Sequence, residues 1–132
     1  MRVGIDISQI IYGTGVSHYR ENLIKNLLEI DKTDEFVFFG GSLRRQADIR
    51  EKLQNLRGNF TSRIFPFPPR VADLIWNKLH ILPIEKMIGK IDVFHTSDWG
   101  EPPSSFPKVT TVHDIVPIKF PRLTAPLVRS AH

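Results

Sequence analysis

The stretch Glu35-Phe36-Val37-Phe38-Phe39 is a continuous aromatic and β-branched run between two polar or glycine-rich turns. The turn before it is Lys32-Thr33-Asp34, and the one after it is Gly40-Gly41-Ser42. A strand that is apolar on both sides needs a cover on both faces, which is typical of a parallel sheet. The stretch therefore predicts an α/β fold with helices on both faces of the sheet.

Strand and helix patterns alternate on both sides of this stretch. Further strands are expected at 2–7, 61–65, 91–94 and 108–112, with the run from Val109 to Val112 buried. Helices are expected from Ser17, as N-cap, to about Ile30, and at about 43–56, 71–80 and 83–88. The first helix should bury one apolar face, formed by Tyr19, Leu23, Ile24, Leu27, Leu28 and Ile30. Such alternation predicts a Rossmann-like parallel sheet in the order 3-2-1-4-5.

Composition sets broad limits on this chain. Its 132 residues, 41% of them hydrophobic, suffice for one domain with a buried core. The absence of cysteine excludes disulfides and thiolate metal sites and suggests a reducing, cytoplasmic location. No apolar run reaches the roughly 18 residues that span a bilayer, so any membrane contact would be peripheral, at the inner face.

The net charge is +4, and much of the excess lies between Arg44 and Arg70. A basic stripe of this kind suits nucleic acid, an anionic membrane face or a phosphorylated substrate, but most such stripes are solvated helix faces. No nucleic-acid motif accompanies it, so we expect no nucleic-acid partner. The basic residues of the segment are Arg44, Arg45, Arg50, Lys52, Arg57, Arg63 and Arg70.

Three polar segments follow strands that the predicted order places side by side. They are Gly13-Thr14-Gly15 after the first strand, His95 to Asp98 after the fourth, and His113-Asp114 after the fifth. Ligands of open parallel sheets bind outside the carboxyl ends of the strands. A glycine loop before a helix also leaves N–H groups for phosphate. These segments are the candidate binding site, although a tight turn and loop-capping side chains remain the simpler interpretations.

The glycine loop differs from two known nucleotide-binding motifs. The dinucleotide fingerprint requires a third glycine where His18 stands, and an acid at the end of the second strand, whereas Asp34 and Glu35 stand at its start. The match is partial, which disfavours a nicotinamide-linked enzyme. A P-loop is excluded because no Gly-Lys-Ser/Thr follows.

The ordered set of motifs resembles the start of family 4 glycosyltransferases of the GT-B fold. The resemblance is carried by 2–6, 13–16, 19–23, 92–96 and 111–117, and spans the chain from Met1 to about Pro121. It implies a retaining transfer of a sugar from a nucleotide-sugar donor to a glycan or lipid-linked acceptor. It also implies no cofactor and no bound metal.

The resemblance implies roles for the candidate residues. Gly13, Thr14 and Gly15 would approach the donor phosphates, and His113 would meet the donor sugar or its phosphate. Asp114 would orient His113 or bind a sugar hydroxyl, whereas His95 and Asp98 would line the acceptor side.

The paired acidic motif of the family's donor-binding domain has no counterpart in these residues. We therefore expect residues 1–132 to be the N-terminal, acceptor-side part of a larger enzyme, through truncation, a split gene or a fragmentary gene model. The missing C-terminal domain or a partner chain would supply the other wall of the cleft. The alternative is a non-catalytic sugar- or nucleotide-binding subunit that pairs with a separate domain.

Overall fold

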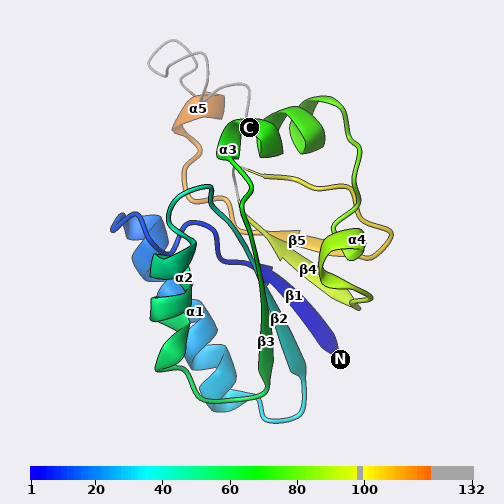
Figure 1. Cartoon of the computed structure of the whole chain (residues 1–132). Coiled ribbons are helices and arrows are strands. Elements are labelled where there is room, and N and C mark those ends of the chain that lie inside the picture. The colour runs from blue at the N-terminus through cyan, green and yellow to red at the C-terminus, as the bar shows by residue number, and fades with distance from the viewer. Residues whose placement is uncertain (98–99, 120–132) are drawn as a thin grey trace.

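A computed structural model describes residues 1–97 and 100–119 of the chain. Its sheet has five strands, all parallel, in the order β3-β2-β1-β4-β5. This confirms the predicted fold class and strand order, with β1 and β4 adjacent at the centre (Figure 1). The strands are β1 (Arg2–Asp6), β2 (Glu35–Gly41), β3 (Phe60–Phe65), β4 (Val93–Thr96) and β5 (Lys108–Thr110).

Helices cover both faces of the sheet. Apolar residues of α1 and α2 form one core cluster with β1 and β2, while η1 and α4 form a second cluster with β2 and β4. The helices are α1 (Gly15–Ile30), α2 (Gln46–Gln54), α3 (Pro69–Ala72), the π-helical η1 (Asp73–Lys78), α4 (Glu85–Ile88) and α5 (Val116–Lys119). The predicted helix at 71–80 is therefore an α-helical turn that continues as η1.

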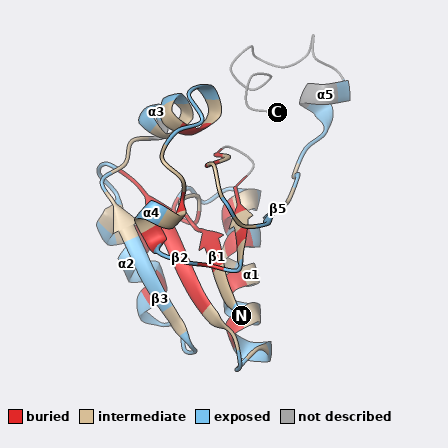
Figure 2. Ribbon diagram, turned by 90° about the vertical axis from the view of Figure 1, so that its right-hand side faces the viewer, coloured by how far each residue is buried: buried red, intermediate tan, exposed pale blue. Residues whose placement is uncertain are grey.

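Strand β2 is buried on both faces, as its sequence predicts (Figure 2). Phe36 and Phe38 point into the cluster under α1 and α2. Val37 and Phe39 point into the cluster that contains Trp76 of η1. Successive strand residues face opposite sides of a sheet, so one apolar run supplies both cores.

The first helix begins earlier than predicted. Thr14, not Ser17, is the N-cap: its side chain accepts a hydrogen bond from the Ser17 backbone, and the Ser17 side chain bonds back to the Thr14 backbone. This reciprocal pair is a capping box, with Ser17 at the third helical position. The prediction placed the cap one turn too late, because serine serves at either position.

The buried face of α1 also differs from the expected one. Ile24 and Leu28 are buried as predicted, but Tyr19 and Ile30 are exposed, at 38% and 77% of their surface. The other buried residues of this face are polar, Ser17 and Arg20. A pattern of apolar residues at helical spacing cannot reveal Ser17 and Arg20. They lie in the N-terminal half of α1, where the buried face of the helix contacts polar groups of other chain segments rather than the apolar core.

The expected buried strand at 108–112 is wrong in both length and burial. Strand β5 has three residues, all exposed, and Val109 and Val112 are 54% and 55% exposed. It is the edge of the sheet and pairs on one side with β4. A β-branched run favours a strand but carries no information on whether another layer covers it.

Candidate functional site

The candidate site lies at the carboxyl ends of β1, β4 and β5. Because β4 lies between β1 and β5, the segments that follow these strands leave the sheet at the same edge. They contain the glycine loop and the His113-Asp114 pair. His95 was expected just after its strand, but it is the third residue of β4 and pairs with Ile5 of β1. Asp98 lies outside the described residues.

The glycine loop leads directly into α1, as predicted. The backbone N–H groups of Gly15 and Val16, in the first turn, make no hydrogen bond within residues 1–97 and 100–119. Unpaired N–H groups and the positive end of the helix dipole favour an anionic ligand here. The first turn carries no acidic side chain that would compete with such a ligand.

The fold requires glycine at one of the two glycine positions of the loop and not at the other. Gly13 has a φ of +68°, in the left-handed region that a side chain disfavours. Gly15 does not adopt such a φ, and a Cβ built on it would meet nothing within 4 Å. The fold therefore explains glycine at position 13 but not at position 15, where a bare backbone leaves room for a ligand.

This difference gives a matched pair of substitutions. Gly13→Ala is expected to lower the free energy of unfolding by about 1 kcal/mol, the cost of a side chain in the left-handed region. Gly15→Ala should leave it unchanged or raise it by up to about 1 kcal/mol, because alanine favours a helix more than glycine does. Urea unfolding of both variants measures this, and a destabilising Gly15→Ala would show that the fold itself needs glycine there.

Arg20 of α1 connects the helix to the end of β4. Its side chain is fully buried, and its Nη1 lies 2.9 Å from Nδ1 of His95. Its Nη2 donates to the backbone carbonyl of Thr96 at 3.2 Å. Since a guanidinium only donates, Nδ1 of His95 must accept, which places the ring proton on Nε2. A buried positive charge thus lies at the carboxyl end of β4, beside a neutral histidine.

The other ring nitrogen of His95 leads to the segment after β5. Nε2 lies 2.9 Å from the hydroxyl oxygen of Thr111, which is 3.1 Å from the hydroxyl of Tyr19. Both ring nitrogens of His95 are therefore engaged within the chain. In this arrangement neither ring nitrogen is free to bind a substrate or to act as its base. No observation tests the expected acceptor-side role of His95, which remains a prediction.

Burial lowers the pKa of His95 to about 4, and the positive charge of Arg20 adds to the effect. His113 acts in the same direction, whereas the carboxylate of Asp6 opposes them. His95 is therefore neutral at physiological pH, in agreement with an Nδ1 that accepts from Arg20.

The lowered pKa predicts a loss of stability in acid. The unfolded chain binds a proton at His95 near pH 6.5, but the folded chain does so only near pH 4. The free energy of unfolding should therefore fall as the pH drops from 6.5 to 4. His95→Asn, which keeps an acceptor toward Arg20 but does not titrate, should lose the part of this slope that one proton contributes. Urea unfolding across this pH range tests it; identical slopes would contradict a depressed pKa.

His113 and Asp114 lie in the irregular segment between β5 and α5. The His113 ring contacts the Tyr19 ring edge-on, with centroids 4.9 Å apart, and its Nε2 is buried with no hydrogen-bond partner among the described residues. Asp114 is exposed and accepts a hydrogen bond from the backbone of Val116 at 2.7 Å. Tyr19 is four residues after Gly15, about one helical turn along α1, so His113 contacts the second turn of the helix that follows the glycine loop.

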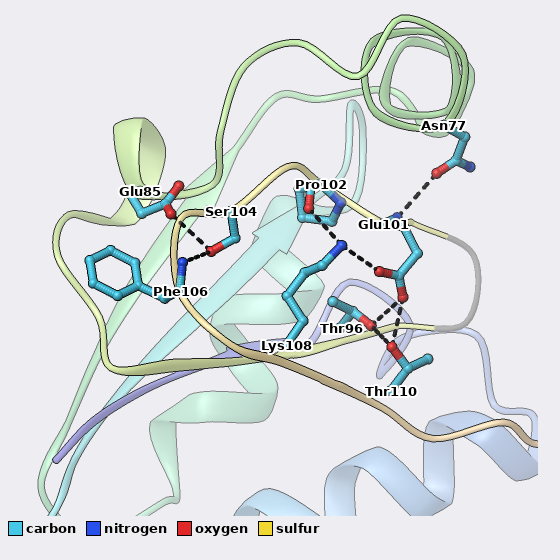
Figure 3. A network of polar contacts seen from close by, with 9 residues as sticks. All are labelled: Asn77, Glu85, Thr96, Glu101, Pro102, Ser104, Phe106, Lys108 and Thr110. Atoms are coloured by element: carbon cyan, nitrogen blue, oxygen red, sulfur yellow. Dashed lines mark hydrogen bonds and ion pairs between the residues drawn. The ribbon is translucent and has the colours of Figure 1, made fainter.

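A polar network joins β4, β5 and the loop between them (Figure 3). Oε1 of Glu101 accepts from the hydroxyls of Thr96 and Thr110, and its Oε2 accepts from Lys108 at 2.9 Å. The Glu101 N–H donates to the Asn77 side chain. Burial raises the pKa of Glu101, but these hydrogen bonds outweigh burial and lower it overall. An ionised Glu101 therefore holds the ends of both strands together beside the candidate site.

Sequence reasoning missed four residues around the site: Arg20, Tyr19, Thr111 and Glu101. Arg20 carried a signal, since it stands four and eight residues before the buried Ile24 and Leu28. A charged residue in line with a buried helical face has to find a partner there. Thr111 and Glu101 carried none. Thr111 contacts His95 and Tyr19, 16 and 92 residues away, and the nearer side-chain partners of Glu101 follow no periodic pattern.

Other features of the described residues do not suggest a rival site. One cavity of about 640 Å³ is an open space between α1 and α2, lined by oppositely charged side chains that include the Lys52–Glu21 ion pair. No group of three or more His, Cys, Asp or Glu side chains suitable for a metal ion occurs among these residues. None of their helices has both the length and the apolar character needed to cross a bilayer.

Comparisons of the chain with protein-family models, with curated proteins and with solved structures return no match.

Proposed function

We propose that this chain forms one wall of a sugar-transfer site and supplies groups that meet the diphosphate and sugar of a nucleotide-sugar donor. The acceptor is a glycan or a lipid-linked saccharide. The second wall, which would hold most of the donor, comes from a donor-binding domain. The proposal joins the family 4 resemblance to the geometry of the sheet edge.

The observation that carries the proposal is the contact of the His113 ring with Tyr19, which stands one helical turn after the start of α1. The His113 ring lies against Tyr19, one turn from Gly15, and its buried Nε2 has no partner within the described residues. Unpaired helix N–H groups attract the negative charge of a diphosphate leaving group. A nearby imidazole can donate to the reacting sugar or its phosphate. Asp114, at the same edge, would bind a sugar hydroxyl or orient His113.

The buried charge of Arg20 supports an anionic ligand at this edge. Its positive charge adds to the potential at the N-terminal half of α1, while the buried carboxylate of Asp6, which also acts on His95, offsets part of it. By contrast, the residues directly after β2 are Ser42, Leu43 and Arg44, with no carboxylate for a ribose. This arrangement does not favour a nicotinamide-linked enzyme.

The test has two steps. First, uridine, guanosine and adenosine diphosphates are titrated into the ¹⁵N-labelled chain, and backbone amide shifts are followed by NMR. Saturable shifts at Gly13 to Val16 and at His113 are expected for one of them. Second, nucleotide-sugar donors are screened on the chain joined to a donor-binding domain. Binding without transfer would favour the non-catalytic subunit, and no binding by any of the three would reject the proposed site.

A separate proposal is that the basic segment from Arg44 to Arg70 rests on an anionic membrane face. Within the described residues, Arg45 and Lys52 form ion pairs with Asp48 and Glu21. The remaining basic residues of the segment are exposed and form no ion pair within that part of the chain: Arg44, Arg50, Arg57, Arg63 and Arg70. Unpaired surface arginines are available to lipid phosphates.

Vesicle co-sedimentation tests this contact. The chain should bind vesicles that contain phosphatidylserine and not vesicles of phosphatidylcholine alone, with at most about 1 kcal/mol from each basic residue near the surface. Binding should weaken as salt is added, because salt screens charges beyond about 10 Å. Arg50→Gln with Arg63→Gln should weaken it further, while Lys25→Gln on α1 serves as the control. Binding that ignores lipid charge or salt would contradict the proposal.

A further inference from the structure

The position of His113 raises a structural question. The segment that carries it follows a three-residue edge strand whose residues are all exposed, and it lies before α5 without regular structure. A segment of this kind has few backbone contacts that could fix a side chain. The side-chain contacts of Tyr19 and Thr111 are therefore the ones to consider.

Thr111 is the point at which these contacts meet. Its hydroxyl oxygen lies 2.9 Å from Nε2 of His95 and 3.1 Å from the hydroxyl of Tyr19. Because Nδ1 of His95 accepts from Arg20, Nε2 must carry the proton and donate to Thr111. The polarity of this first step is thus set by the buried guanidinium.

The second step leads from Thr111 to His113. Tyr19 is 38% exposed, so packing alone does not hold its side chain. The hydrogen bond to Thr111 fixes the hydroxyl end of the Tyr19 side chain. The Tyr19 ring therefore has a defined position when it makes its edge-on contact with the His113 ring. Edge-on aromatic contacts of this kind are worth about 0.5–1.5 kcal/mol and depend on geometry.

We infer that Thr111 is a positioning residue: through Tyr19 it fixes the His113 imidazole beside the first turns of α1. His95 contacts Thr111, and Arg20 contacts His95; these two residues set the direction of the hydrogen bonds. His95 therefore acts on the site indirectly, as a neutral link in this chain of contacts. The effect of Thr111 on ligand binding rests on the proposed function, whereas its effect on the position of His113 does not.

The experiment compares two neighbouring threonines in the full chain. Thr111→Val removes the hydroxyl that joins His95 and Tyr19 while keeping the shape of the side chain. Thr110→Val is the matched control, because its hydroxyl donates to Glu101 and lies beside the hydroxyl of Thr96 rather than joining His95 to Tyr19. Thr111→Ser restores the hydroxyl and should rescue the effect.

The readout is NMR of the histidine and tyrosine rings without ligand. In the wild type, the ¹⁵N shifts of His95 should show a proton on Nε2, and ring protons of Tyr19 and His113 should show mutual cross-peaks. Thr111→Val should lose these cross-peaks and move the His113 ring shifts toward those of the exposed His18. Thr110→Val and Thr111→Ser should keep both features.

Two results would overturn the inference. One is an unchanged Tyr19–His113 contact in Thr111→Val. The other is an equal change in Thr110→Val, which would mean that any loosening of this edge releases His113.

Titration with the nucleoside diphosphates separates this inference from the proposed function. If one binds the wild type, its affinity should fall about tenfold in Thr111→Val, the effect that loss of a single good hydrogen bond can have. It should stay within about twofold in Thr110→Val. A wild-type chain that binds none of them would reject the proposed function while the ring measurements still decide the positioning role.

Discussion

Replacing His113 by alanine is expected to lower turnover by about a hundredfold or more when the chain is assembled with a donor-binding domain, as loss of a positioned transition-state donor does. The fold should survive, because His113 lies in an irregular segment beyond β5 and outside both core clusters. Steady-state kinetics gives the loss in kcat, and thermal melting of the same variant gives the change in Tm.

The control for this variant is His18→Ala. His18 is exposed on α1, near the glycine loop in sequence but on the outer face of the helix. His80 is a poorer control. Its backbone has a φ of +50°, so a substitution there would also alter a strained turn. Near-full turnover of His113→Ala, or a loss explained entirely by unfolding, would remove His113 from the site.

Replacing Arg20 by methionine is expected to lower the free energy of unfolding by about 3 kcal/mol. Methionine fills a similar volume but leaves the Thr96 carbonyl and Nδ1 of His95 without the donor that they have in the wild type. The pKa of His95 should rise, because the nearby positive charge is gone. Urea unfolding measures the first effect, and NMR titration of His95 the second.

Lys25→Met on the exposed side of α1 is the control, and should change stability by no more than about 0.5 kcal/mol. If Arg20→Met is as stable as the wild type, the free-energy cost of burying the guanidinium equals the stabilisation from its hydrogen bonds. In that case the residue is kept for the ligand or for positioning, and the pKa of His95 would still report its charge.

The sequence was sufficient for the fold because its signals there are local. A run such as Phe36 to Phe39 tells by itself that both faces of its strand are covered, and alternation with helical segments then leaves few topologies. Errors fell where two local interpretations compete. Serine serves as N-cap or as third helical residue, and a β-branched run such as Val109 to Val112 occurs in central and edge strands alike.

For the candidate site, the strand pattern was enough to predict which segments meet, because in this strand order the residues after β1, β4 and β5 leave the sheet at the same end. The sequence also marked Gly13 and Gly15 as special, though not for different reasons. The burial of Arg20 against His95, and the link that Thr111 makes between His95 and Tyr19, became visible only in the folded chain. Hydrogen bonds between side chains 75 or 92 residues apart leave no periodic pattern in the sequence, because each depends on a single pair of atoms brought together by the packing of the whole sheet.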